Sequence, residues 1–356
     1  MQTYTKIQTG ISAHIGNGHE QQDDACIIKK PDLNCTIIAV ADGHGSYTGK
    51  TAANACIRGL QDFTDANIEL ITQDVPSFLE KCYEYLHNEV RTEFVKQYAR
   101  QYKDVTVDHD GRVLYRMLPS QSYVHVNGGA MLTIAVLIQG KLYISNVGDC
   151  KAILCTPDNA EILTRDHSPD NHAEHARIKS DESNKLLFVY DDLTIKKKCY
   201  CEPIYDDEDN VREDVKFYYK SISKDRATYV TTPEEHPYAD ALASTRAIGN
   251  YNMNCLGVTW IPEIKVMDLN TLCDKTICIA IATDGIWDNL LDDAMRKCTM
   301  HEPCLKLVEE DDALNKDNAA TRIAKSIVTR VAGIAQKNFP NNADNMTCAL
   351  MYLTME

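Results

Sequence analysis

The stretch TIIAVADGHGSYTGKTAAN, residues 36–54, runs from an apolar segment through a glycine-rich turn into a helical pattern. Isoleucine, valine and alanine dominate its first half, which predicts a central strand that is buried on both faces. Asp42 stands where this strand ends, and a glycine follows it at once. This turn could hold the phosphates of a nucleotide or a metal ion, and the two possibilities define different proteins.

The nucleotide interpretation rests on Gly49-Lys50-Thr51, which matches the end of the phosphate-loop pattern Gly-x-x-x-x-Gly-Lys-Ser/Thr. The first glycine of that pattern would be residue 44, which is a histidine. An aspartate at the mouth of the turn would also repel phosphate unless a metal ion intervened. We therefore interpret Lys50 and Thr51 as the opening turn of a helix.

Short apolar strands recur along the chain and do not alternate with helices. Residues 131–163 combine β-rich runs with turns and predict an antiparallel meander, and residues 276–285 and 346–355 predict two further strands. Apolar residues at helical spacing predict helices over 49–72 and 75–102, paired as a hairpin, and over 318–339. This order disfavours a doubly wound parallel sheet and favours a layered α+β sandwich.

Composition narrows the class of partner. The 356 residues are 44% hydrophobic and 25% charged, with a formal net charge of −15, which disfavours binding to nucleic acid or to anionic membranes. No apolar run approaches the roughly 20 residues of a membrane span, and the first residues show no signal-peptide core, so we expect a cytoplasmic or nuclear location. The one close cysteine pair, Cys199 and Cys201, lacks a second pair for a structural zinc site.

Carboxylates stand at the ends of several predicted strands or in tight turns. They are Asp23, Asp24, Asp42, Asp149, Asp284 and Asp344. Any one of them could be an ordinary turn residue. If the strand ends converge, however, these carboxylates would repel one another strongly unless a cation neutralised them. Oxygen-only ligand sets of this kind suit Mg²⁺ or Mn²⁺.

The chain resembles the metal-dependent, type 2C family of serine/threonine protein phosphatases. The resemblance is carried by an ordered series of motifs spread over nearly the whole chain: EQQDDA, ADGHGS, GGAMLTIAVL, ISNVGDCKAIL, LTRDHSP, LASTRAIGN, ATDGIWDNL and ADNMTCALM.

The resemblance implies a four-layer α-β-β-α sandwich in which two mostly antiparallel sheets are flanked by helix pairs. It implies one catalytic domain over residues 1–356, into which residues of about 180–238, rich in charge and tyrosine, are inserted as a flap-like segment. The implied activity is hydrolysis of phosphoserine and phosphothreonine in phosphoproteins, by direct attack of a hydroxide that bridges two Mn²⁺ or Mg²⁺ ions. We expect the protein to be a monomer.

Metal ligands follow from the same motifs. By motif position, Asp42 bridges both ions and the Gly43 carbonyl is a further ligand. Asp284 and Asp344 hold the first ion, and Asp23 holds the second. A third ion, present in some members of the family, corresponds to Asp149 and Asp288, together with Asp284.

Two further residues carry implied catalytic roles. Asp24 orients metal-bound waters, and His44 is the general acid that protonates the leaving alkoxide. Thr245 and Arg246, in LASTRAIGN, are interpreted as structural residues beside the flap.

Three positions depart from the family pattern. His19 stands where an arginine usually binds the substrate phosphate, Asp23 replaces a glutamate, and Asn250 replaces an aspartate. The first departure predicts weaker phosphate binding. The alternative function is a catalytically impaired pseudophosphatase that acts as a binding or scaffold protein, although all the core metal aspartates are present.

Overall fold

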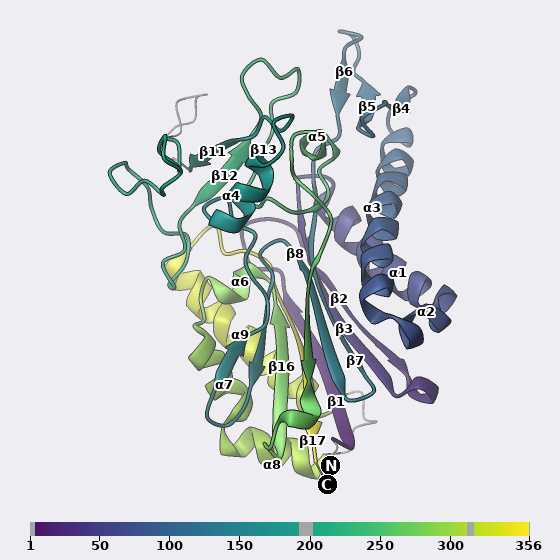
Figure 1. The fold of residues 1–356 in the computed structure, drawn as a ribbon, viewed down its shortest axis with the longest axis vertical. Coiled ribbons are helices and arrows are strands. Elements are labelled where there is room, and N and C mark those ends of the chain that lie inside the picture. The colour runs from purple at the N-terminus through teal and green to yellow at the C-terminus, as the bar shows by residue number, and fades with distance from the viewer. Residues whose placement is uncertain (1–3, 192–201, 312–316, 356) are drawn as a thin grey trace.

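Two antiparallel sheets packed face to face form the centre of the molecule (Figure 1). The computed structural model describes residues 4–191, 202–311 and 317–355. The first sheet has the strand order β1 (Lys6–His14), β17 (Met346–Thr354), β16 (Thr276–Ala282), β9 (Lys151–Cys155), β10 (Ala160–Ile162). The second has the order β15 (Glu263–Asp268), β8 (Lys141–Val147), β7 (Gly129–Ile138), β3 (Cys35–His44), β2 (Asp24–Lys30), with β14 (Ile248–Gly249) also paired to β7. In β1 and β17, Lys6 lies opposite Thr354 and His14 opposite Met346.

The interior strands are apolar on both faces because each face has its own partner layer. In β3, Ile37 and Ala39 pack toward the neighbouring helices, whereas Ile38 and Val40 pack against the other sheet. Strand β16 shows the same division between its odd and even positions. Burying an isoleucine or valine side chain contributes about 1.5–3 kcal/mol relative to exposure, which explains the continuous apolar runs in the sequence.

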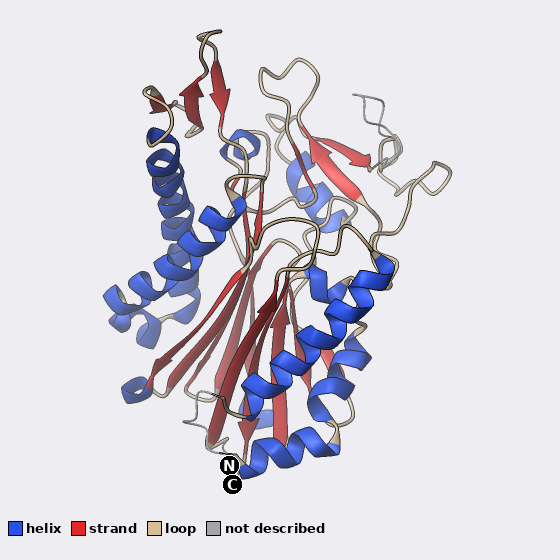
Figure 2. Ribbon diagram, turned by 180° about the vertical axis from the view of Figure 1, so that it is seen from behind, coloured by secondary structure: helices blue, strands red, loops and turns tan. Residues whose placement is uncertain are grey.

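Helices cover the outer face of each sheet (Figure 2). The second sheet is covered by α1 (Gly49–Ala66), α2 (Ile68–Gln73) and α3 (Val75–Ala99), and the first by α7 (Asp292–Met300), α8 (Glu302–Glu310) and α9 (Ala319–Asn338). The predicted α-β-β-α sandwich and its helices are therefore confirmed. None of the helices in the described ranges is long and apolar enough to cross a membrane.

The predicted meander over residues 131–163 is wrong in one respect. Strands β7 and β8 pair in the second sheet, but β9 and β10 pair in the first, so the chain crosses the sandwich after β8. The crossing is the turn at Gly148 and Asp149. Gly148 has φ +104°, and a Cβ there would lie 2.4 Å from the Met131 sulfur, so this turn requires glycine.

Two small sheets stand beyond one end of the sandwich (Figure 1). One comprises β4 (Val105–Val107), β5 (Val113–Arg116) and β6 (Tyr123–His125); the other comprises β11 (Leu187–Tyr190), β12 (Thr228–Thr231) and β13 (Ala241–Leu242). Strands β11 and β12 belong to the segment expected as an insertion, whereas Cys199 and Cys201 lie outside the described residues. The remaining short elements are η1 (Pro31–Leu33), α4 (His172–Lys179), α5 (Tyr251–Asn254), η2 (Leu269–Thr271) and α6 (Asp284–Trp287).

Candidate active site

The strand-end carboxylates from both sheets meet around one cavity. Asp42 lies near the end of β3, and Asp284 follows β16 in the opposite sheet. Asp344 precedes β17, and Asp149 lies in the turn where the chain crosses between the sheets. All four line a cavity of 660 Å³, together with Gly43. The structure thus brings together residues that are up to 302 positions apart in the chain, Asp42 and Asp344 among them.

Asp23 supplies a further carboxylate from the position just before β2, and it is only 8% exposed. Its Oδ2 accepts a hydrogen bond from Thr283 Oγ1 at 3.1 Å. Its Oδ1 is buried and has no hydrogen-bond partner among the described residues. A buried carboxylate oxygen without a donor is costly, so this atom indicates that a partner such as a cation belongs beside it.

Burial and mutual repulsion shift the protonation of this cluster. Burial, followed by the neighbouring carboxylates of Asp23 and Asp284, raises the pKa of Asp42 well above its ordinary value. Burial likewise raises the pKa of Asp284, and Asp344 adds to the effect. Burial raises the pKa of Asp23 to about 7. These groups would ionise more readily if positive charge were present among them.

The cluster fits divalent cations. Its donors are carboxylate and carbonyl oxygens, as Mg²⁺ and Mn²⁺ prefer, and Asp23, with its orphaned oxygen, interacts electrostatically with Asp42 and Asp344. Gly43 allows the turn to close, because a Cβ at this position would lie 2.3 Å from the Gly49 carbonyl oxygen. Lys50 and Thr51 lie in the first turn of α1, as the sequence predicts.

His44 lines the same cavity and is held by Asn250. Its Nε2 lies 2.6 Å from Asn250 Oδ1, and because an amide oxygen only accepts, Nε2 is the donor in this bond. The buried Nδ1 has no hydrogen-bond partner in the part of the chain that the structure describes. Burial lowers the pKa of His44, while the Asn250 contact opposes that shift. Asn250, noted in the sequence only as a departure, therefore orients the imidazole.

His19 lies at the cavity and contacts Asp344. The His19 Nε2 is 2.8 Å from Asp344 Oδ1, and its Nδ1 is 2.9 Å from the Glu20 carbonyl oxygen. The hydrogen bond with Asp344 raises the pKa of His19 to about 9, against the lowering effect of burial. His19 is therefore cationic at neutral pH, rather than partly charged as its ordinary pKa would suggest.

Asp24 lies away from this cavity. It lines a separate cavity of 470 Å³ beside α1 and α3, which also contains Arg58. Its Oδ1 accepts a hydrogen bond from the Ala25 amide at 2.8 Å. Adjacent residues entering a strand face opposite sides, so Asp23 and Asp24 cannot both point into the cluster. The expected role of Asp24 in orienting metal-bound water stays a prediction.

A second, smaller cavity of 280 Å³ shares Asp149 and Asp284 with the first. Asp288, expected at a third ion, lines it, and so do Asp166 and Lys220, to which the sequence analysis gave no role. Burial raises the pKa of both Asp166 and Asp288 to about 7, and Lys220 opposes each shift. Asp166 lies in the motif LTRDHSP and could have been suspected, but Lys220 belongs to no motif.

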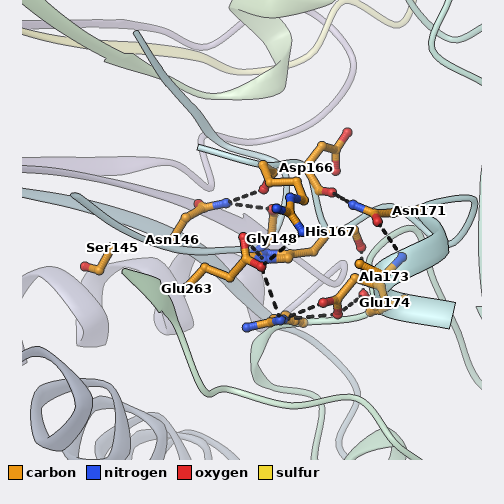
Figure 3. Close-up of polar contacts among 12 residues, drawn as sticks. Ser145, Asn146, Gly148, Asp166, His167, Asn171, Ala173, Glu174 and Glu263 are labelled. Atoms are coloured by element: carbon orange, nitrogen blue, oxygen red, sulfur yellow. Dashed lines mark hydrogen bonds and ion pairs between the residues drawn. The ribbon is translucent and has the colours of Figure 1, made fainter. Parts of the chain in front are cut away.

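A polar network supports the Gly148–Asp149 turn from behind (Figure 3). The Gly148 amide donates to His167 Nδ1 at 3.0 Å, and Asn146 Nδ2 donates to the Gly148 carbonyl oxygen at 3.1 Å. His167 Nε2 faces Glu263 at 3.6 Å. These contacts fix the turn that presents Asp149 to both cavities.

The potential ligand atoms of Glu174, His167 and Glu263 lie within 4.8 Å of one another, a spacing that could hold a metal ion, but arginines already neutralise Glu174. Arg246 Nη2 donates to Glu174 Oε1 at 2.6 Å, and Arg177 Nη2 donates to its Oε2 at 2.9 Å. Burial alone would raise the pKa of Glu174, but these hydrogen bonds outweigh it and lower that pKa to about 2. Glu174, Arg177 and Arg246 therefore form a network of ion pairs.

The fold is a sandwich of two antiparallel sheets flanked by helices, with an acidic cavity at the strand ends, and comparison with known proteins identifies its family. The family model described as Protein phosphatase 2C matches residues 12–185 and 229–328, which is more than half of the chain. The chain therefore belongs to the protein phosphatase 2C family, and its enzyme class is protein-serine/threonine phosphatase. Residues 186–228 lie outside the match.

Similar proteins include probable protein phosphatase 2C 75 of Arabidopsis thaliana, 23% identical over 91% of this chain and 69% of that protein. Human protein phosphatase 1M is 28% identical over 46% of this chain and 39% of its own length. Among solved structures, serine-threonine phosphatase 2C from Toxoplasma gondii aligns over 99% of this chain and 98% of its own, with a TM-score of 0.59 and 16% identity. The sex-determining protein of C. elegans aligns over 98% of this chain and 65% of its own, with a TM-score of 0.60 and 15% identity.

Proposed function

We propose that this chain hydrolyses phosphoserine and phosphothreonine in phosphoproteins with the help of divalent metal ions. The observation that supports this most directly is the group of carboxylates from both sheets around one cavity, with the buried Asp23 oxygen lacking a partner among the described residues. A cluster with this repulsion is stable at neutral pH only when cations share its charge. The family assignment independently favours the same chemistry.

The residues fit two Mn²⁺ or Mg²⁺ ions. Asp42 and the Gly43 carbonyl lie on β3, between Asp284 of the other sheet and Asp23 before β2, and Asp344 completes the set. When bound, such ions supply an activated water molecule and neutralise the charge of the phosphate. The protein supplies a fixed set of oxygen ligands, held by strands that cannot move apart without breaking the core.

His44 supplies the proton that the leaving serine or threonine oxygen requires. Its Nε2 is committed to Asn250, so Nδ1 is the nitrogen that carries the transferred proton. The Asn250 contact fixes the imidazole plane and leaves Nδ1 free within the described residues. The buried setting lowers the pKa of His44, which makes the imidazolium a stronger acid.

His19 attracts the phosphate at the edge of the cavity. The contact with Asp344 raises the pKa of His19 and so favours the imidazolium, which carries fewer donors than the arginine that family members usually have there. It also contacts Asp344, which competes with phosphate for the same Nε2–H. We therefore propose that phosphate binding is weaker here than with an arginine.

The substrates we propose are phosphoproteins, bound by a monomer in the cytoplasm or nucleus. The net charge of −15 argues against nucleic-acid or anionic-membrane partners.

The test uses the full chain, stripped of metal and reloaded with Mn²⁺ or Mg²⁺. A phosphothreonine peptide and p-nitrophenyl phosphate serve as substrates for the wild type, Asp42→Ala and the control Asp158→Ala, which changes an exposed turn residue. We expect metal-dependent turnover that only Asp42→Ala abolishes. A folded wild type that binds Mn²⁺ but hydrolyses neither substrate would instead identify a pseudophosphatase.

A further inference from the structure

Lys220 projects into the smaller cavity beside the proposed metal cluster. The cavity walls carry five carboxylates, those of Asp149, Asp166, Asp225, Asp284 and Asp288. Lys220 Nζ lies 3.7 Å from Asp149 Oδ2, and the Asp149 side chain is only 8% exposed. Lys220 also interacts electrostatically with Asp166 and Asp288. The Lys220 ammonium therefore faces carboxylates from several elements of the fold, in a cavity that Lys151 and Arg165 also line.

The backbone around Lys220 is docked on the same wall. The Ile222 amide donates to the Asp288 carbonyl oxygen at 3.1 Å, which ties the segment to the end of α6. The Lys220 amide donates to the Asp225 carbonyl oxygen at 2.8 Å, so residues 220–225 form a closed turn. Asp225 Oδ2 accepts from Ser221 Oγ at 2.6 Å, within the turn. The turn that carries Lys220 is thus held in place by its own hydrogen bonds.

This lysine lies in a part of the chain that the family model does not match, because the match breaks between residues 185 and 229. The carboxylates that it faces at Asp149, Asp166 and Asp288 all lie in matched residues. Carboxylates from residues that the family model matches are therefore met by a cation from a segment that it does not match.

We propose that the Lys220 ammonium takes the place of a third divalent ion among Asp149, Asp166 and Asp288, and so fastens the inserted segment to the edge of the active site. The proposal builds on the proposed function, because it concerns the same acidic cluster. A divalent ion would need carboxylate oxygens at 2.0–2.6 Å and most of their charge. An ammonium group on a flexible stem satisfies the same oxygens at longer distances and cannot be removed by a chelator.

The first test counts Mn²⁺ ions bound to the metal-stripped full chain, by electron paramagnetic resonance of free Mn²⁺ at up to millimolar concentrations. Lys220→Met removes the charge and keeps the length, and Lys224→Met changes an exposed lysine in the same turn. We expect Lys220→Met to bind one more ion per chain than the wild type and Lys224→Met. Equal numbers in wild type and Lys220→Met would refute the proposal, as would three ions in the wild type.

The wild-type count tests the proposed function separately. Two ions, both lost in Asp42→Ala, support that function, whereas none would contradict it. The difference between Lys220→Met and wild type still decides the role of the lysine in either case.

The second test needs no stable variant. Hydrogen exchange at the Ile222 amide, which donates to Asp288, reports whether the turn stays docked. Mn²⁺ that saturates the two cluster sites should leave this protection in the wild type unchanged. A tenfold or greater loss of protection at that concentration would mean that a metal ion displaces the lysine, and the proposal would fail. Where Lys220→Met folds, its Ile222 amide should exchange at least tenfold faster than in Lys224→Met.

Discussion

The two acidic cavities share a wall but are built in different ways. The larger one collects Asp42, Asp284 and Asp344 from the ends of core strands, so the packing of two sheets fixes their positions. The smaller one collects Asp166, Asp225 and Lys220 from loops, and Lys220 comes from the inserted segment, whereas Lys151 and Arg165 also line the cavity. The core strands thus supply carboxylates that need a bound cation, whereas the inserted segment supplies a cation, Lys220, from the chain itself. Asp149 lines both cavities and so connects the carboxylates of the core strands with those of the loops.

The largest effect should come from removing a strand-end ligand. Asp284→Asn should lower Mn²⁺-dependent hydrolysis of a phosphopeptide by at least about a thousandfold, because the charge that binds metal and supports the reaction is lost. The same change should raise the stability of the metal-free protein in urea unfolding, since it removes a buried charge from a repulsive group. A metal-free variant less stable than wild type would show that Asp284 has a structural role instead.

The second-largest effect should come from the polar network around Glu174, which supports the Gly148–Asp149 turn. Glu174→Gln leaves Arg246 and Arg177 without their buried carboxylate, and should destabilise the fold by about 3–5 kcal/mol. The pKa of Glu174 is about 2 in the folded protein, below its ordinary value of 4.5. Its contribution is therefore complete above pH 4.5 and is lost as the pH falls towards 2.

Denaturant unfolding between pH 3 and pH 7 measures the difference in free energy of unfolding between wild type and Glu174→Gln. The gap between wild type and Glu174→Gln should narrow below pH 4.5. A gap that stays constant over the whole range would mean that the carboxylate charge is not what stabilises the turn.

A smaller effect should separate proton donation from metal chemistry. His44→Asn should lower kcat for a phosphothreonine peptide by about a hundredfold, because the leaving alkoxide needs a proton. The loss should be much smaller for p-nitrophenyl phosphate, whose leaving group departs as a stable anion. Steady-state kinetics on both substrates, with the exposed His109→Asn as control, provide the measurement. Equal losses on both substrates would exclude general-acid catalysis by His44.

The smallest effect belongs to the cavity edge. His19→Ala should raise KM by less than about tenfold with little change in kcat, since the side chain is 40% exposed and screened by solvent. His19→Arg should lower KM. The imidazolium is lost as the pH rises, and metal at Asp344 would bring the pKa of His19 below about 9. We therefore expect KM to rise between about pH 6.5 and pH 9 in wild type but not in His19→Arg; a flat wild-type profile would place His19 away from phosphate.

Sequence reasoning reached the strand-end cavity because local patterns encode it. A continuous apolar run such as residues 36–41 means a strand with both faces covered, and an Asp-Gly pair at its end means an open turn. The sandwich, its helices and the meeting of Asp42 with Asp284 follow from that logic and from the family motifs. The contact between His44 and Asn250 does not, because no local pattern shows which side chain a histidine will meet 206 positions away.

The structural features that the sequence did not predict have different causes. The crossing at Gly148 was missed because a hairpin turn and a turn that changes sheets have similar local sequences. Asp24 lines a separate cavity because strand alternation turns it away from the side that Asp23 faces, and its expected role beside metal-bound water stays a prediction. Lys220 carried no signal at all, since one lysine in a charged insertion looks like any solvated side chain.

The pairing of β1 with β17 has a mechanical consequence. Lys6 lies opposite Thr354 at one end of this pair, and His14 lies opposite Met346 at the other, two residues after Asp344. A force that separates Lys6 from Thr354 would open the two strands one pair at a time, as a zipper opens, and would reach Asp344 last. An ion held jointly by Asp344 and residues of both sheets would cross-link the two sheets at this last position. In single-molecule pulling, metal should therefore leave the start of opening unchanged and strengthen only its final step.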